Sequence, residues 1–246
     1  MSRPRPLLLL GDVASTQDEA HALARGGAPH GTVVVAEAQS AGRGRQGGAW
    51  IDAPGGSLLH SQILRPARAV QNLPTLSLVA GIAVAEAVVS LGAEARLKWP
   101  NDVLVDGRKV AGILADLHQP GPVVILGIGI NVRPVSAVEE TGSGGGGPTS
   151  LVESGVGADR LTVLRRVLEC FDEVYAAWAD RGFASLVGRY AALDCLAGTW
   201  IEGVGTERPV RGIVRGVDAH GALILESDGE RRPVTSGAVR QVRRLD

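Results

Sequence analysis

The residues best suited to chemistry lie in one stretch, residues 98–116, which reads KWPNDVLVDGRKVAGILAD. Both lysines of the chain, Lys98 and Lys109, fall in this stretch, and the other 23 of the 25 basic residues are arginines. A lysine ammonium is a compact, mobile charge, whereas an arginine guanidinium is a rigid planar fork. The two exceptions to the use of arginine therefore indicate positions where the chain needs a compact cation.

The same stretch predicts the elements that position these side chains. The WPND segment cannot continue a helix, because proline fixes its own φ and pushes the preceding residue toward extended geometry. Residues 103–105 and 109–115 are expected to form paired strands joined by a tight Asp-Gly turn. Lys109 then begins the second strand, with Asn101 and Asp102 just before the first.

A second candidate is the loop at residues 37–50, which contains GRGRQGG and ends at Trp50. Four glycines and two arginines in seven residues cannot build a core. Glycine lets backbone N–H groups converge on an anion, and arginine offers forked donors to phosphate. The residue types predict an anion-binding loop that carries Arg43, Gly44 and Arg45. The alternatives are a mobile basic loop or an RG-type nucleic-acid tract.

Two further segments could hold a small polar ligand. Ser15 and Thr16 precede a predicted helix at residues 17–25, and a first helical turn presents free N–H groups together with hydroxyls. Such a turn suits a head group such as a ureido ring. The apolar strand VVILGIGINV has glycines at alternate positions, which clears one face of its pleat. A helix N-cap and a strand packed under another backbone are the structural alternatives.

Together these segments resemble the biotin protein ligases. KWPND with RKVAGIL, the GRGR loop with its tryptophan, the Ser-Thr pair and GIGINV carry the resemblance, which covers residues 12–132 closely and 196–242 more loosely. Members of this family activate biotin with ATP to biotinyl-5'-AMP and pass the biotin to a lysine of a biotin carrier protein. The resemblance thus implies a ligase whose substrates are biotin and ATP, with Mg2+ accompanying the ATP.

The resemblance also assigns roles to residues of this chain. Lys109, Arg43 and Arg45 are expected to stabilise charge on the phosphoryl oxygens, and Asp102 is expected beside the metal ion or the carrier's amine. The residues expected to contact biotin are Ser15, Thr16, Gln17, Gln39, Arg43, Gly44, Arg45, Lys109 and Gly112. Those expected to contact ATP are Arg43, Arg45, Trp50, Asn101, Asp102, Lys109 and Asn131, the last against the base.

The chain departs from the family pattern at two of these places. Gln17 stands where the pattern has asparagine after Ser-Thr, and its longer amide is expected to act similarly. Gly48 stands where the pattern has a third arginine in the loop. The second departure bears on how tightly the loop holds the reactive adenylate.

The pattern of elements predicts an α+β fold with two domains. Residues 1–195 are expected to form a mixed β-sheet with packed helices, like the catalytic domain of biotin and lipoate ligases. Apolar residues at helical spacing predict helices at 73–91, 159–180 and 183–193. Residues 196–246 contain five short strands separated by turn residues, which predict a small SH3-like β-barrel.

Composition limits the function classes. The 246 residues carry a net charge of -1, which argues against nonspecific nucleic-acid binding by the whole molecule. Cys170 and Cys195 are expected to be buried thiols, and the five histidines show no spacing typical of metal ligands. Residues 7–10 are predicted as a buried first strand, too short for a signal peptide. A glycine-rich surface loop is expected at residues 139–149.

The expected partner is a biotin carboxyl carrier protein or domain. No stretch is apolar enough to span a bilayer, so no membrane partner and a cytoplasmic location are expected. No segment before Leu7 can hold a helix-turn-helix, so the resemblance is to the monofunctional type without specific DNA binding. The oligomeric state is left open between monomer and homodimer.

Two rival functions stay open on the sequence. A lipoate or octanoate protein ligase shares the scaffold, although GRGR and KWPND favour biotin. A non-catalytic module could hold RNA or another polyanion through the glycine-arginine loop and the terminal barrel. The near-neutral charge and the use of only two lysines speak against that module.

Overall fold

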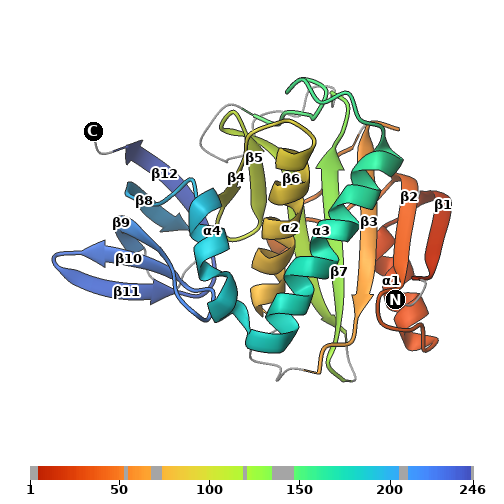
Figure 1. The fold of residues 1–246 in the computed structure, drawn as a ribbon, viewed down its shortest axis with the longest axis horizontal. Helices are drawn as coiled ribbons and strands as arrows, with labels where there is room; N and C mark the ends of the chain where they lie inside the picture. The colour runs from red at the N-terminus through yellow and green to blue at the C-terminus, as the bar shows by residue number, and fades with distance from the viewer. Residues whose placement is uncertain are drawn as a thin grey trace.

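A computed structural model describes residues 5–52, 55–67, 74–118, 121–134, 147–204 and 210–244. The larger of its sheets has seven strands in the order β1-β2-β3-β7-β6-β5-β4 (Figure 1). β1 and β2 pair in parallel and the other neighbours are antiparallel, which confirms the predicted mixed sheet. The strands are β1 Leu7–Val13, β2 Val33–Gln39, β3 Ser57–Leu64, β4 Ala95–Lys98, β5 Asp102–Val105, β6 Arg108–His118 and β7 Val123–Asn131.

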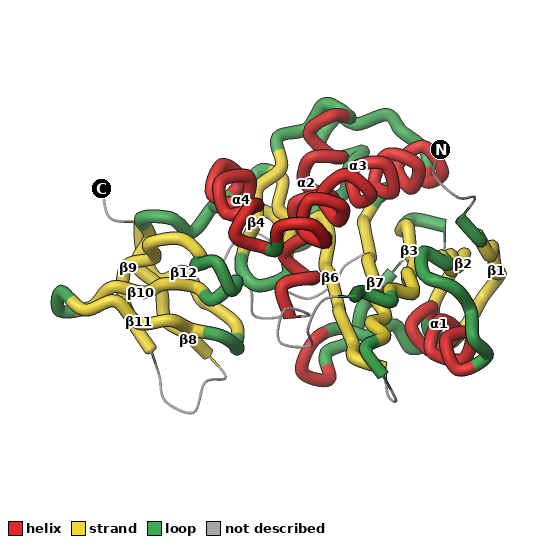
Figure 2. Tube along the Cα trace, turned by 60° about the horizontal axis from the view of Figure 1, so that its bottom comes forward, coloured by secondary structure: helices red, strands yellow, loops and turns green. Residues whose placement is uncertain are grey.

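Helices cover both faces of this sheet, as Figure 2 shows. α2 (Leu76–Ser90) and α3 (Arg160–Arg181) lie over one face, and α1 (Thr16–Arg25) lies over the other. α2 is apolar around most of its circumference because the sheet covers one side of it and α3 covers another. The prediction placed the start of this helix at residue 73, which lies outside the described residues. The chain then continues through η3 (Phe183–Leu186) and α4 (Val187–Leu193).

The first strand lies at the edge of the sheet and is not buried, so that prediction was wrong. β1 pairs with β2 on one side, and among the described residues no strand pairs with its other side. Leu7 is 47% exposed and Leu9 is 62% exposed. A run of leucines shows that a strand is apolar, but it does not show whether the strand has one neighbour or two.

The smaller sheet follows α4 and has the antiparallel order β11-β10-β9-β8-β12. Trp99, just after β4, donates from Nε1 to the carbonyl of Gly221 at 3.1 Å, which ties this sheet to the larger one. Closure into an SH3-like barrel stays a prediction. The strands are β8 Thr199–Val204, β9 Val210–Val217, β10 Leu223–Ser227, β11 Glu230–Val234 and β12 Ala238–Arg244.

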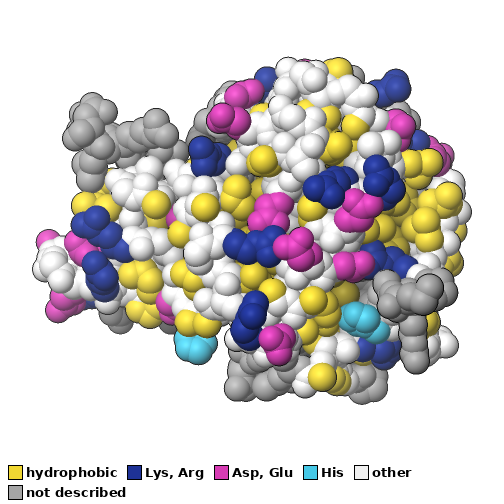
Figure 3. Space-filling model, in the orientation of Figure 1, with side chains coloured by type: hydrophobic (Ala, Val, Ile, Leu, Met, Phe, Trp, Pro, Cys, Tyr) yellow, Lys and Arg dark blue, Asp and Glu magenta, His cyan; other side chains and the backbone are white. Residues whose placement is uncertain are grey.

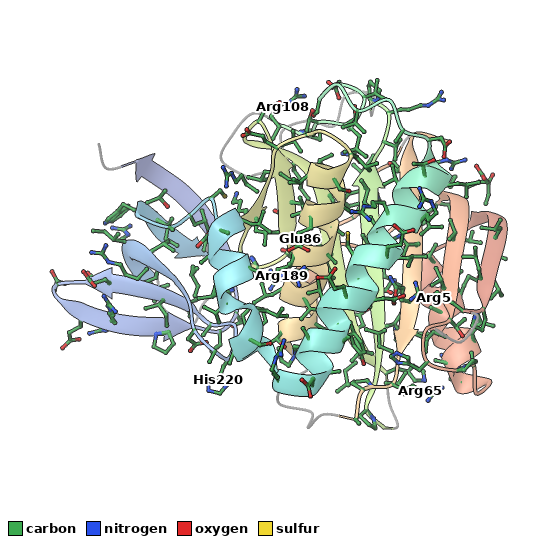
Figure 4. All side chains as sticks on the ribbon, viewed as in Figure 1. Arg5, Arg65, Glu86, Arg108, Arg189 and His220 are labelled. Atoms are coloured by element: carbon green, nitrogen blue, oxygen red, sulfur yellow. The ribbon has the colours of Figure 1, made fainter. Side chains whose placement is uncertain are left out.

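Charged side chains fasten the helical layer. Arg189 of α4 donates from Nε to Glu86 of α2 at 2.8 Å and lies 3.1 Å from Glu173 of α3 (Figure 4). These contacts hold three helices together and raise the pKa of Arg189. Over the face shown in Figure 3, basic and acidic side chains are interspersed, and they do not form a basic tract.

The cysteines only partly match their prediction. Cys170 on α3 is buried, but Cys195, between α4 and β8, is half-buried, so the prediction was wrong for the second thiol. Both thiols are free, and burial, followed by the charge of Asp194, raises the pKa of Cys195 to about 11. Residues 135–146, which include most of the predicted glycine-rich loop, lie outside the described residues.

His60 on β3 makes the stability of the fold depend on pH. The side chain is 1% exposed, and burial, with a smaller effect of the Arg5 charge, lowers its pKa from 6.5 to about 3. Below pH 6.5 the unfolded chain therefore binds a proton that the folded chain excludes. We expect the free energy of unfolding to fall by up to about 1.4 kcal/mol per pH unit as the pH drops through this window.

Urea unfolding of the intact chain between neutral and acidic pH measures this slope. His60→Gln should flatten it, whereas His220→Gln, a change at an exposed position of the small sheet, should leave it unchanged. Equal slopes for the unaltered chain and His60→Gln would contradict the prediction.

Candidate active site

The predicted hairpin forms and brings an ammonium to a carboxylate. Asp106 and Gly107 have φ of 51° and 73°, values that suit the tight turn between β5 and β6. Lys109 pairs with Leu104, and Gly112 pairs with Asp102 across the two strands. Lys109 Nζ consequently lies 2.6 Å from Asp102 Oδ1.

Glycines clear the face of the sheet beside this pair. Gly112 on β6 and Gly129 on β7 are direct cross-strand neighbours, and the indole of Trp50 lies against both. A Cβ atom at Gly129 would lie 2.5 Å from Trp50 Cε2. A Cβ atom at Gly127 would lie 3.0 Å from Gln17 Cδ. The sequence pattern of alternate glycines therefore makes room for Trp50 and Gln17.

A cavity opens over these glycines. Eleven of the predicted site residues line it. They come from the start of α1, from β2, from the glycine-arginine loop that ends at Trp50 (the arginine loop), from the segment before β5, and from β6. The apolar part of its lining, including Leu59 and Ile128, was missed by the sequence reasoning, although strand alternation could have indicated it. The lining is Ser15, Thr16, Gln17, Gln39, Arg43, Gly44, Arg45, Ala49, Trp50, Leu59, His60, Asn101, Lys109, Gly112, Ile113, Leu114, Gly127, Ile128 and Gly129.

One end of the cavity is built from hydrogen-bonding side chains. Ser15 caps α1 by accepting from the N–H of Gln17 at 3.3 Å. Thr16 donates from both its backbone N–H (2.7 Å) and its hydroxyl (3.0 Å) to Gln39 Oε1. In turn, the Ser61 hydroxyl donates to Thr16 Oγ1 at 2.9 Å. These bonds use the oxygen of the Gln39 amide and leave its NH2 group as a donor.

Within the described part of the chain, Gln17 keeps a hydrogen-bond acceptor free, whereas Gln39 keeps a donor free. Its Nε2 donates to Asp116 Oδ2 at 3.1 Å, so its oxygen is turned away from that carboxylate. Gln17 Oε1 is buried and accepts no hydrogen bond from the described residues. The polar end of the cavity thus includes an acceptor, from Gln17, and a donor group, from Gln39.

The arginine loop folds back over the cavity as a short hairpin. Gly42 accepts from the N–H of Trp50 at 3.0 Å, and Arg43 bridges to Ala49. Arg43 forms an ion pair with Asp18 in the first turn of α1. Arg45 begins the turn η1 (Arg45–Gly47). The predicted loop is therefore ordered around its two arginines, and each has a different anchor.

Arg45 links the loop to the small sheet. Its Nη1 donates to the carbonyl of Gly237 at 3.1 Å and to Asn101 Oδ1 at 3.3 Å. Burial lowers the pKa of Arg45, and the charge of Asp102 opposes this shift. The small sheet thus contacts the loop that lines the cavity, through residues so far apart in the chain that no sequence spacing indicates the contact.

Two predicted residues lie outside the lining. Asp102 is behind Lys109, in the ion pair described above. Asn131 is 4% exposed and donates from Nδ2 to the carbonyl of Thr149 at 3.0 Å. The expected contact between Asn131 and a base therefore stays a prediction. In the part of the chain that the structure describes, no three metal-ligating side chains gather into a metal site, and no helix is long and apolar enough to cross a membrane.

Known proteins share this architecture. Residues 12–132 match the Biotin/lipoate A/B protein ligase family, and residues 203–239 match the Biotin protein ligase C terminal domain. The biotin--[acetyl-CoA-carboxylase] ligase of Mycobacterium tuberculosis is 36% identical over 97% of this chain and 90% of its own. That of Paracoccus denitrificans is 34% identical over 94% of this chain and 98% of its own.

A solved structure agrees with these matches. The biotin protein ligase from Aquifex aeolicus in complex with biotin and ATP is similar with a TM-score of 0.85, 30% identity, and coverage of 97% of this chain and 100% of that one. The mixed sheet, the glycine-cleared cavity and the terminal sheet thus define a protein ligase of the biotin and lipoate type. The chain belongs to the biotin protein ligases within that family.

Proposed function

We propose that this chain activates biotin with ATP to biotinyl-5'-AMP and then transfers the biotin to a lysine of a biotin carrier protein. The main observation in favour is the composition of one cavity, which holds Lys109, Arg43 and Arg45 together with a separate neutral polar end. The cations suit a phosphate and a carboxylate, and the polar end suits an uncharged head group.

The polar end favours biotin over lipoate or octanoate. A cyclic urea has N–H donors and a carbonyl acceptor, which complement Gln17 Oε1 and the NH2 group of Gln39. A dithiolane ring or an alkyl chain supplies no N–H donor, so the buried oxygen of Gln17 would stay without a partner. Discrimination by an unpaired buried acceptor is strong, because that acceptor loses water and gains nothing in return.

In the first step, a carboxylate oxygen of biotin attacks the α-phosphorus of ATP in line, and pyrophosphate leaves. Lys109, Arg43 and Arg45 stabilise the charge that grows on the phosphoryl oxygens, and the cavity aligns the two reactants. In the second step, the neutral amine of the carrier lysine attacks the mixed anhydride and AMP leaves, with the amine proton passing to a base or to water. No covalent enzyme intermediate is needed.

Mg2+ would accompany the ATP. A magnesium ion usually takes one or two carboxylates together with phosphate oxygens and water, so the single carboxylate of Asp102 fits an ion carried in largely by the nucleotide. Bound there, the ion would neutralise phosphate charge. Asp102 also holds the ammonium of Lys109, which fixes where that charge meets the reacting phosphate.

We assign the domains as predicted, with residues 1–195 as the ligase domain and residues 196–246 as the C-terminal domain. In support, the small sheet begins at Thr199, after α4. Arg45 and Trp99 both bond to backbone carbonyls of the small sheet, which suits a C-terminal domain that caps the site. The predicted partner is the carrier protein alone.

The decisive experiment incubates the intact chain with ATP, Mg2+ and a biotin carrier domain, and follows the mass of the carrier. We expect a gain of one biotinyl group that requires both ATP and biotin. Lipoate and octanoate in place of biotin test the rival ligase. Turnover with lipoate alone would overturn the assignment to biotin, and salt-sensitive RNA binding with no turnover would favour the polyanion module.

The missing third arginine gives a further prediction. Gly48 has an extended backbone with φ of -64°, so a side chain is sterically allowed there if the carbonyl of Arg45, which would lie 3.2 Å from a Cβ atom at this position, moves slightly. We expect Gly48→Arg to slow the escape of biotinyl-5'-AMP about tenfold by adding one charged donor near the phosphate. Release of labelled adenylate after gel filtration measures this, and Gly157→Arg is the matched control at an open position. An unchanged escape rate would show that the loop retains the adenylate without that cation.

A further inference from the structure

A chain of polar side chains lies behind the Gln17 end of the cavity, and the reaction above does not use it. Gln17 Nε2 donates to Asp116 Oδ2 at 3.1 Å. The same carboxylate oxygen lies 4.0 Å from His21 Nε2. His21 Nδ1 and His118 Nδ1 are 2.8 Å apart, with ring centroids 5.0 Å apart. The four side chains come from the first turns of α1 and from the end of β6.

Asp116 determines which way the Gln17 amide points. An ionised carboxylate only accepts hydrogen bonds, so the amide must turn its NH2 group toward Asp116. The amide oxygen, the buried acceptor described above, then lies over Gly127 of the cavity lining, 3.1 Å from where a Cβ atom of that glycine would be. Without this constraint, the amide could rotate and present donors to the ligand, which would clash with the N–H groups of a urea.

Two histidines lie beside Asp116: His21 faces its carboxylate, and His118 contacts His21. A 2.8 Å contact between two Nδ1 atoms requires one nitrogen to donate and the other to accept. The charged groups around the pair are Asp116 on β6, Arg43 on the loop and Asp18 on α1. Burial, then His118, then Arg43 lower the pKa of His21, while Asp116 and Asp18 raise it, and the net shift is downward. His21 is therefore uncharged at neutral pH.

We propose that Asp116 is a positioning residue for Gln17, and that protonation of His21 weakens ligand binding through it. A proton on His21 turns Nε2–H into a charged donor 4.0 Å from Asp116 Oδ2. That charge attracts the carboxylate toward His21 and so weakens its hydrogen bond to Gln17. The Gln17 amide then loses its fixed orientation, and the affinity for a urea falls. The inference rests on the proposed function, because biotin is the urea in question.

Biotin binding by calorimetry tests this on the intact chain. At about pH 7.5, Asp116→Asn should raise the Kd for biotin about tenfold, the effect of misplacing one hydrogen-bond acceptor, and leave kcat for adenylate formation nearly unchanged. Between about pH 7.5 and about pH 5.5, the Kd of the unaltered chain should rise several-fold as His21 gains a proton. In Asp116→Asn that rise should be absent, which a merely structural defect would not explain.

Two further variants separate the parts of the proposal. His21→Gln removes the group that takes up the proton and keeps Asp116 in place, so it should retain the affinity at neutral pH and lose most of the acidic rise in Kd. His220→Gln, in the exposed turn between β9 and β10, should match the unaltered chain at both pH values. If Asp116→Asn does not fold, His21→Gln decides the pH effect by itself.

The outcomes distinguish this inference from the proposed function. If the unaltered chain binds biotin, and Asp116→Asn and His21→Gln share both its Kd and its pH profile, the proposed role of Asp116 and His21 is refuted and the ligase assignment stands. If the unaltered chain does not bind biotin at either pH, the ligase assignment fails, and the proposed role of Asp116 and His21 fails with it.

Discussion

Lys109→Ala is expected to lower the rate of adenylate formation by about a hundredfold to a thousandfold, the usual cost of removing one charged donor from a developing anion. Lys109 Nζ lines the cavity beside Asp102, and its side chain is one-third exposed, so the fold does not depend on it. Biotin-dependent exchange of pyrophosphate into ATP measures this step. Thermal unfolding should be nearly unchanged.

The neighbouring position supplies the control for this prediction. Arg108, labelled in Figure 4, is also basic and also lies at the start of β6, but it bonds to the carbonyl of Pro148 and faces Glu153. Arg108→Ala should therefore leave the exchange rate within about twofold of the unaltered chain, as expected of a surface ion pair. Normal exchange in Lys109→Ala would remove the ammonium from the mechanism.

Gly129→Ala is expected to weaken biotin binding about a hundredfold, because one methyl group displaces the indole that closes the cavity. The added Cβ would lie 2.5 Å from Trp50 Cε2 and 2.7 Å from Cζ2, distances that real Cβ atoms do not show. Trp50 must move, and the arginine loop that ends at it must move as well. Calorimetric titration with biotin measures the loss.

Gly188→Ala is the control for this prediction, because it makes the same substitution where a Cβ atom has open space. No atom lies within 4 Å of a Cβ at Gly188, which is on α4. Alanine should be neutral there or stabilise the helix by about 0.5–1 kcal/mol, because glycine costs more backbone entropy in a helix. Similar biotin affinity for Gly129→Ala and the unaltered chain would mean that Trp50 does not define the cavity.

Local patterns predicted the elements of the site well, because each depends on a few neighbouring residues. The Asp-Gly turn, the Ser15 cap and the alternate glycines act over distances of two to four residues, and all formed as expected. The buried first strand was wrong for the opposite reason. Whether β1 has one neighbour or two is set by strand order, which its own residues do not encode.

The sequence alone determined the residue types of the site and the family, because motif order and local geometry are written along the chain. The tertiary structure decided which of these groups meet. It joined Arg45 to Gly237, engaged Asn131 with Thr149, and placed His21 beside His118, although the two histidines are 97 residues apart. Such contacts follow from strand order and from the packing of α1 on the sheet, so they depend on all of the intervening chain at once.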